Sequence, residues 1–267
     1  MGVLTVDLTA FGVVMSADSN PIELLDGETR LGAHPGRWHT RNPILTREAG
    51  GFSGMIGFVG TEEISTRSTR DWLTAFDARH PDESLADYAD ALAEELTDEW
   101  DRLGLRSVLE IMIAGVEHGE IRFWVVRNSD GLNEDGTYRA PKASFEAVDD
   151  LDGNYVPQDA APGQSKEDLL NTRLYSFRLG ALLPAAGIFD AFRDILQTLF
   201  ANRIEGFAPM KSLGDLGHFA RHRLEFVKRL YSKKHGIYRE AAAPIGGKIH
   251  VVGVGRDGVI RKFSKHT

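Results

Sequence analysis

The order of strand-like and helix-like segments constrains the fold of this chain more than any other feature. Short apolar runs rich in β-branched residues come in blocks, and amphipathic stretches with a three- and four-residue spacing come in separate blocks. The predicted order is four strands, two helices, two or three strands, two or three helices and two closing strands. Blocks favour layered α+β architecture over alternating parallel units. We therefore expect a four-layer αββα sandwich, with two antiparallel sheets between outer helices.

The first block of strands opens the chain. Two apolar, β-branched runs with a turn near Ala10 to Gly12 predict a β-hairpin, and a long loop rich in Gly and Pro follows at 19–40. The strands of this block are predicted at residues 3–8, 13–17, 43–46 and 52–60. The last of these strands is rich in glycine, so another backbone or a ligand could approach it closely.

The later elements follow from apolar spacing and turn signals. Helices are predicted at 61–76, 85–103, 167–204 with a break near Pro184, and 212–235. Further strands are predicted on either side of a tight turn at 117–119, at 144–148, and on either side of a hairpin turn at 255–258. The polar stretch 150–166 predicts a loop.

Length and composition limit the classes of protein. With 267 residues and 42% apolar residues, the chain can form one domain over 1–267. The net charge of −8 argues against a nucleic-acid partner. No apolar run approaches the length of a membrane span, and the N-terminus lacks the pattern of a signal peptide. The absence of cysteine excludes disulfides and Cys-ligated zinc and fits a cytoplasmic protein.

Four stretches, in order along nearly the whole chain, resemble the proteasome-type N-terminal-nucleophile (Ntn) hydrolases, which include proteasome β subunits, HslV and the bacterial Anbu group. They are "GVVMSADS" at 12–19, "MIGFVGTEE" at 55–63, "SVLEIMIAGVEHGEIRFWVV" at 107–126 and "PIGGKIHVVGVGRDGV" at 244–259. The resemblance implies the four-layer sandwich. Residues at about 150–205 are less similar and look like a longer helical region than the family usually has. It also implies assembly, because the family forms rings, and it implies no cofactor or metal.

The resemblance also implies positions for the family's catalytic groups. Asp18 matches the family's aspartate, and the nucleophile position falls on Gly2. The lysine position falls on Arg41, with His39 as a neighbouring candidate on the same face. The glycine that builds the oxyanion hole falls on Gly60, with Gly57 as the alternative. For Asp18, a turn-capping role is equally open.

Two of these replacements predict a loss of the family's chemistry. Glycine offers no hydroxyl to attack a carbonyl, and arginine stays protonated above pH 12 and so cannot relay a proton. The first hypothesis is therefore a proteasome-like subunit that forms a ring-like homo-oligomer without threonine-peptidase activity, a pseudoenzyme with a protein or peptide as a further partner. The second hypothesis is an active Ntn-type amide hydrolase with an unusual nucleophile: Thr5, Ser16 or Ser19.

One further pair of residues has a spacing that suits a metal. His218 and His222 lie four apart on a predicted helix, but no glutamate stands between them as in a zinc protease. We expect a solvated basic helix face and no metal site. The basic stretch 221–235 is either a partner surface or an ordinary cationic helix end.

Overall fold

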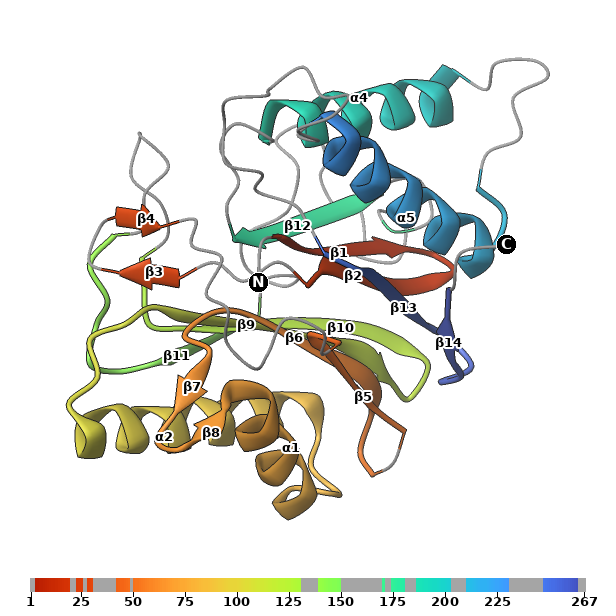
Figure 1. Ribbon diagram of the computed structural model, residues 1–267. Helices are drawn as coiled ribbons and strands as arrows, with labels where there is room; N and C mark the ends of the chain where they lie inside the picture. Colours follow the sequence, from red (N-terminus) through yellow and green to blue (C-terminus); the bar gives the residue numbers. More distant parts are fainter. Residues whose placement is uncertain are drawn as a thin grey trace, which may run out of the picture.

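The computed structural model confirms the four-layer αββα sandwich. It describes residues 3–19, 23–25, 28–30, 42–48, 50–130, 139–149, 170, 174–180, 186–202, 210–230 and 247–263. In Figure 1, α4 and α5 lie on one side of two stacked sheets, and α1 and α2 lie on the other side. The helices span Thr69–Arg79 (α1), Leu85–Leu103 (α2), Ala186–Asn202 (α4) and Leu213–Leu230 (α5).

The first sheet contains both ends of the described chain. Its strands, in spatial order, are β12 (Tyr175–Gly180), β1 (Val3–Thr9), β2 (Gly12–Asp18), β13 (Ile249–Gly255) and β14 (Ile260–Lys262). Every neighbouring pair is antiparallel. The hairpin predicted at the start of the chain is confirmed as β1 and β2, and the hairpin predicted at its end is confirmed as β13 and β14.

The second sheet is also antiparallel and lies between the first sheet and α2. Its strands, in spatial order, are β11 (Glu146–Asp149), β10 (Glu120–Arg127), β9 (Leu109–Glu117), β6 (Ser53–Gly60) and β5 (Ile44–Arg47). All of these strands lie close to their predicted positions. Two small hairpins complete the described strands: β3 (Glu23–Leu25) with β4 (Glu28–Arg30), and β7 (Glu63–Ile64) with β8 (Arg67–Ser68).

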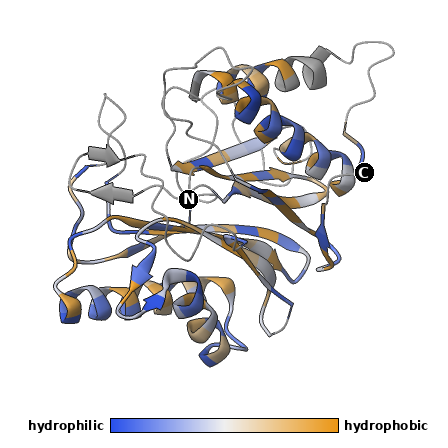
Figure 2. Ribbon diagram, in the orientation of Figure 1, coloured by the Kyte–Doolittle hydropathy of each residue, from blue (hydrophilic) through white to orange (hydrophobic). Residues whose placement is uncertain are grey.

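Strand alternation separates the two faces of the first sheet. Leu4 and Val6 of β1 pack in the core between the sheets, whereas Val3 packs in the core beneath α5. Thr5 and Asp7 share the face of Val3, because successive side chains of a strand point to opposite sides. Figure 2 shows hydrophobic residues along both sheets and hydrophilic residues on much of α2 and α5. The first sheet is therefore covered on both faces, and polar groups on its α5 face need partners within the protein.

The helix predicted to begin at Thr61 in fact begins at Thr69. Ser68 is its N-cap, and the Ser68 hydroxyl accepts a hydrogen bond from the backbone N–H of Asp71. Thr61 instead donates from its hydroxyl to Ser107 at 2.6 Å, and Glu62 accepts from the backbone of Thr69. Thr61 and Ser68 are both residue types that cap helices, and both precede the apolar face of this helix. The hydrogen bonds of Thr61 and Glu62 to other segments leave Ser68 as the N-cap.

The helical periodicity predicted from residue 167 to 204 is also wrong in part. Residues Tyr175–Gly180 form β12, which pairs with β1 at the edge of the first sheet, and the helix begins only at Ala186. Pairing with β1 stabilises the extended form of a segment whose own spacing fits a helix. The long loop predicted at 19–40 contains the short hairpin β3–β4. Residues 20–22, 26–27 and 31–40 of that loop, and residues 150–166, lie outside the described residues.

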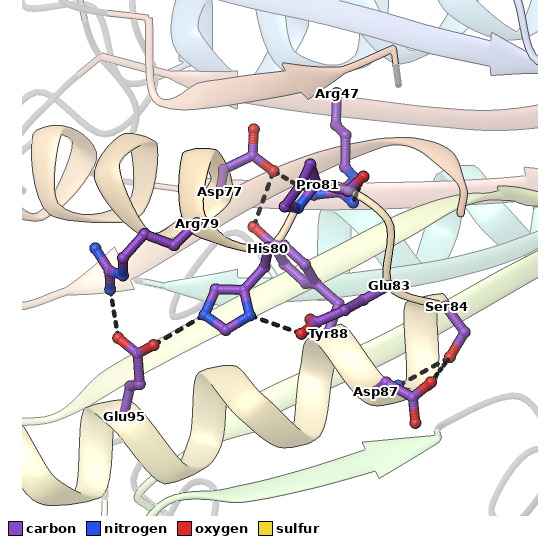
Figure 3. Close-up of polar contacts among 10 residues, drawn as sticks. All are labelled: Arg47, Asp77, Arg79, His80, Pro81, Glu83, Ser84, Asp87, Tyr88 and Glu95. Atoms are coloured by element: carbon purple, nitrogen blue, oxygen red, sulfur yellow. Dashed lines mark hydrogen bonds and ion pairs between the residues drawn. The ribbon is translucent and has the colours of Figure 1, made fainter. Parts of the chain in front are cut away.

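A polar cluster fixes the corner between α1 and α2 to the second sheet (Figure 3). The guanidinium of Arg47 is buried; it donates to Asp77 at 2.7 Å and to the Pro81 carbonyl at 2.6 Å. It also lies over the rings of Phe52 and Tyr88, 4.6 and 4.8 Å from their centroids. These contacts hold the corner against the turn between β5 and β6.

His80 lies in the same corner and bridges two carboxylates. Its Nδ1 is 2.7 Å from Glu83, its Nε2 is 2.9 Å from Glu95, and Arg79 also pairs with Glu95 (Figure 3). Burial lowers the pKa of His80, but the hydrogen bonds and charges of the two glutamates outweigh burial and raise the pKa above its ordinary value of 6.5. The corner therefore favours the protonated imidazole.

Candidate functional site

Asp18 is the last residue of β2 and is fully buried. Its Oδ1 accepts a hydrogen bond from the backbone N–H of Val3 at 2.8 Å. A charge-assisted bond of this kind stabilises the first described residue of β1 against the end of β2. Asp18 thus bonds to Val3, the residue that directly follows the predicted nucleophile position.

Gly60 ends β6 in a conformation that favours glycine. Its φ angle is +104°, and a Cβ at this position would lie 2.1 Å from the Val108 carbonyl oxygen. The backbone N–H of Thr61 donates to the same carbonyl at 3.0 Å. Gly57, the alternative candidate, packs between the sheets, where a Cβ would lie 2.7 Å from side-chain atoms of Leu4 and Met15. Close packing accounts for Gly57, whereas the turn at the end of β6 requires Gly60.

Strand register brings Asp18 and the end of β6 to the same end of the sandwich. Leu4, which pairs with Ala17 of β2, lies against Gly57, three residues before Gly60. Ile44, the first residue of β5, pairs with Gly57. The predicted positions Gly2 and Arg41, and the alternative His39, lie outside the described residues. Their roles stay predictions.

A buried polar cluster that the sequence reasoning missed lies on the α5 face of the first sheet. Both Nη atoms of Arg223 donate to Asp7, at 2.9 and 2.7 Å, and the two side chains are 1% and 0% exposed. Arg223 also donates to the hydroxyl of Thr5 at 3.0 Å, and Thr5 is 2.6 Å from the hydroxyl of Ser16. Ser176 of β12 donates to Asp7 at 2.6 Å. The signal for this cluster was the set of polar residues at alternate positions of β1: Thr5, Asp7 and Thr9.

This cluster bears on the alternative nucleophiles. Thr5 and Ser16 are fully buried under α5, on the face of the sheet opposite the inter-sheet core. A hydroxyl there cannot reach a substrate without separation of α5 from the sheet. Ser19 is partly exposed, and its Oγ accepts from the backbone N–H of Lys248 at 2.7 Å.

The described residues contain no group of three or more His, Asp or Glu side chains arranged to hold a metal. His222 is exposed on α5, and His218 lies edge-on to the ring of Phe263 at 6.1 Å. Within the described ranges, no helix combines the length and the apolar character needed to span a bilayer.

The two stacked antiparallel sheets between helix layers define a proteasome-type Ntn fold, and comparison with solved structures confirms it. Anbu (ancestral beta-subunit) from Yersinia bercovieri is 11% identical, with 97% of this chain and 85% of that chain covered at a TM-score of 0.50. The Anbu (Gly-1) mutant from Hyphomicrobium sp. strain MC1 is 12% identical, with 98% and 87% covered at a TM-score of 0.51. No protein-family model and no curated protein matches the chain. At these identities the likeness establishes the fold and not the activity.

Proposed function

We propose that this protein is a proteasome-like subunit that assembles into a homo-oligomer and has no threonine-peptidase activity. The burial of Thr5 and Ser16 carries the second part of the proposal, because it leaves two of the three alternative hydroxyls without access to a substrate. The cytoplasmic location expected from the composition is part of the same proposal.

The chemistry of the family explains why Gly2 matters. An Ntn hydrolase attacks with a hydroxyl on its first residue and uses the free amine, with a lysine and an aspartate nearby, to move the proton. In this chain the aspartate position is kept as Asp18. Gly2 supplies an amine but no hydroxyl, and Arg41 supplies a positive charge but stays protonated and cannot relay a proton. The frame of the site is retained, and the groups that would act on a substrate are replaced.

Exposed apolar side chains on the outer helices support assembly. Ile195 of α4 is 57% exposed and Phe226 of α5 is 44% exposed. The ring of Phe192 lies 5.3 Å from the ring of Phe226, so the two helices present an aromatic pair near one face. Apolar surface of this kind is covered in many assemblies by a neighbouring subunit.

The proposal is tested by light scattering and by labelling with active-site probes. We expect a mass several times 29.5 kDa and no covalent adduct after incubation with a peptide epoxyketone or a β-lactone. A probe adduct on Ser19, or on a new N-terminus at Thr5, supports instead an active hydrolase with an unusual nucleophile. Intact mass of the untreated protein shows whether the chain begins at Met1, Gly2 or Thr5.

A further inference from the structure

His250 lies on β13 at the same end of the first sheet as Asp18. Its partner on β2 is Ala17, the residue before Asp18. Val252, two residues further on, packs in the core between the sheets, whereas Ile249 packs in the core beneath α5. Since side chains alternate along a strand, His250 lies on the inter-sheet face, at the end of the first sheet where Asp18 lies.

The imidazole of His250 has an incomplete set of hydrogen bonds. Its Nε2 is buried, and it has no hydrogen-bond partner among the described residues. The residue as a whole is partly exposed. A buried polar atom without a partner is costly, and a ligand atom that bonds to Nε2 would remove this cost.

Positive charges from three parts of the chain act on His250. Lys248 lies two residues before it, Arg70 lies in the first turn of α1, and Arg221 lies on α5. Nη1 of Arg70 donates to the carbonyls of Asn42 and Ile44, the latter at 3.2 Å, which places this side chain beside β5 of the second sheet.

The charge of Arg221 acts on His250 from α5, on the other side of the first sheet. Arg221 donates to the carbonyl of Phe263, whose backbone N–H bonds to Val251 of β13, and it is 3.7 Å from Glu225. Burial lowers the pKa of His250, and the charges of Lys248, Arg221 and Arg70 lower it further. The imidazole is therefore neutral at pH 7 and lies in a positive electrostatic potential.

We propose that the end of the inter-sheet space beside His250 is an anion-binding subsite that takes a carboxylate, either the C-terminal carboxylate of a peptide or that of a small acid. His250 donates from Nε2 to one carboxylate oxygen, and Arg70 and Lys248 supply the positive potential. The proposal rests on the site placed at this end of the sandwich by the proposed function. It does not depend on whether the protein cuts peptides.

The test follows the imidazole itself by NMR of the full-length protein with ¹³C-labelled histidine. The His250 resonance is identified by its loss in His250→Asn, and its pKa is measured with three probes: N-acetyl-Ala-Ala with a free carboxylate, the same peptide as its C-terminal amide, and acetate. A bound carboxylate stabilises the imidazolium, so we expect the free peptide acid to raise the pKa of His250 by about 0.5 or more. The amide should leave it unchanged.

The probes separate the two sources of carboxylate. An effect of acetate equal to that of the peptide acid supports a small acid, and an effect of the peptide acid alone supports a peptide terminus. An equal effect of the acid and the amide, or no effect of either acid, overturns the proposal. The resonance of His222, exposed on α5, serves as the internal control.

A pair of lysine variants tests the role of the positive potential. Lys248 and Lys211 are both exposed, so neither substitution removes packing from the core. Lys248→Gln should raise the pKa of His250 in the free protein and weaken the effect of the peptide acid, whereas Lys211→Gln should do neither. Identical results for the two variants contradict the proposed role of Lys248. These outcomes are independent of oligomer mass and of probe labelling, which test the proposed function.

Discussion

The buried ion pair between Asp7 and Arg223 leads to a prediction about stability. Both Nη atoms of Arg223 bond to Asp7, and Arg223 also holds the hydroxyl of Thr5. Asp7→Asn removes the negative charge, keeps the shape and leaves the guanidinium in the interior without a counter-ion. Breaking a buried pair in this way costs roughly 3–5 kcal/mol of unfolding free energy. For a chain of this size that corresponds to a fall in Tm of roughly 6–20 °C.

The assay is thermal unfolding followed by circular dichroism at one fixed protein concentration, because assembly would make Tm depend on concentration. Arg261→Met is the matched control: its pair with Asp257 is about half exposed, and its loss should cost no more than about 1 kcal/mol. The double variant Asp7→Leu with Arg223→Met removes both charges and should recover most of the loss. A Tm for Asp7→Asn within about 2 °C of wild type would refute the argument that this pair joins α5 to the sheet.

Three further predictions follow from other parts of the structure. The pKa of folded His80 lies above its unfolded value of about 6.5, so the stability it contributes is complete below that pH and is lost as pH rises through the folded pKa. The difference in Tm between wild type and His80→Gln should therefore shrink as the pH is raised. A difference that stays constant with pH would contradict the bridge to Glu95. Gly60→Ala places a Cβ against a backbone carbonyl at positive φ and should destabilise by roughly 1–3 kcal/mol in denaturant titration; an unchanged midpoint would show that the turn relaxes. Asp18→Ala removes the acceptor of the Val3 N–H, whereas Asp18→Asn keeps an oxygen that can accept it. Amide hydrogen exchange at Val3 should therefore be faster in Asp18→Ala than in Asp18→Asn, and equal exchange rates would exclude that bond.

Most of the fold could be predicted from local patterns. Alternating apolar residues identified the hairpins of both sheets, and the three- and four-residue spacing of Leu85 to Trp100 identified α2, which ends at a left-handed Gly104. The errors share one physical cause. Residues 61–68 and β12 carry weak local signals, and hydrogen bonds to distant segments decide their conformation.

Two candidate residues could be placed from the sequence because their motifs coincide with strand ends, and their roles stay predictions. Asp18 and Gly60 both lie at the ends that the motifs indicated. The bond between Asp7 and Arg223 joins residues 216 positions apart, and no periodicity predicts such a pairing. The proposed role of His250 could not be predicted for a similar reason, since it depends on the positive charges of Arg70 on α1 and Arg221 on α5.

Native mass spectrometry of the full-length protein after incubation with a peptide epoxyketone tests the central claim most directly, because one spectrum reports both assembly and reactivity. The account predicts ions at several times 29.5 kDa, with no added probe mass on any subunit. A species at 29.5 kDa alone would contradict assembly, and one probe per subunit would contradict the absence of a working nucleophile.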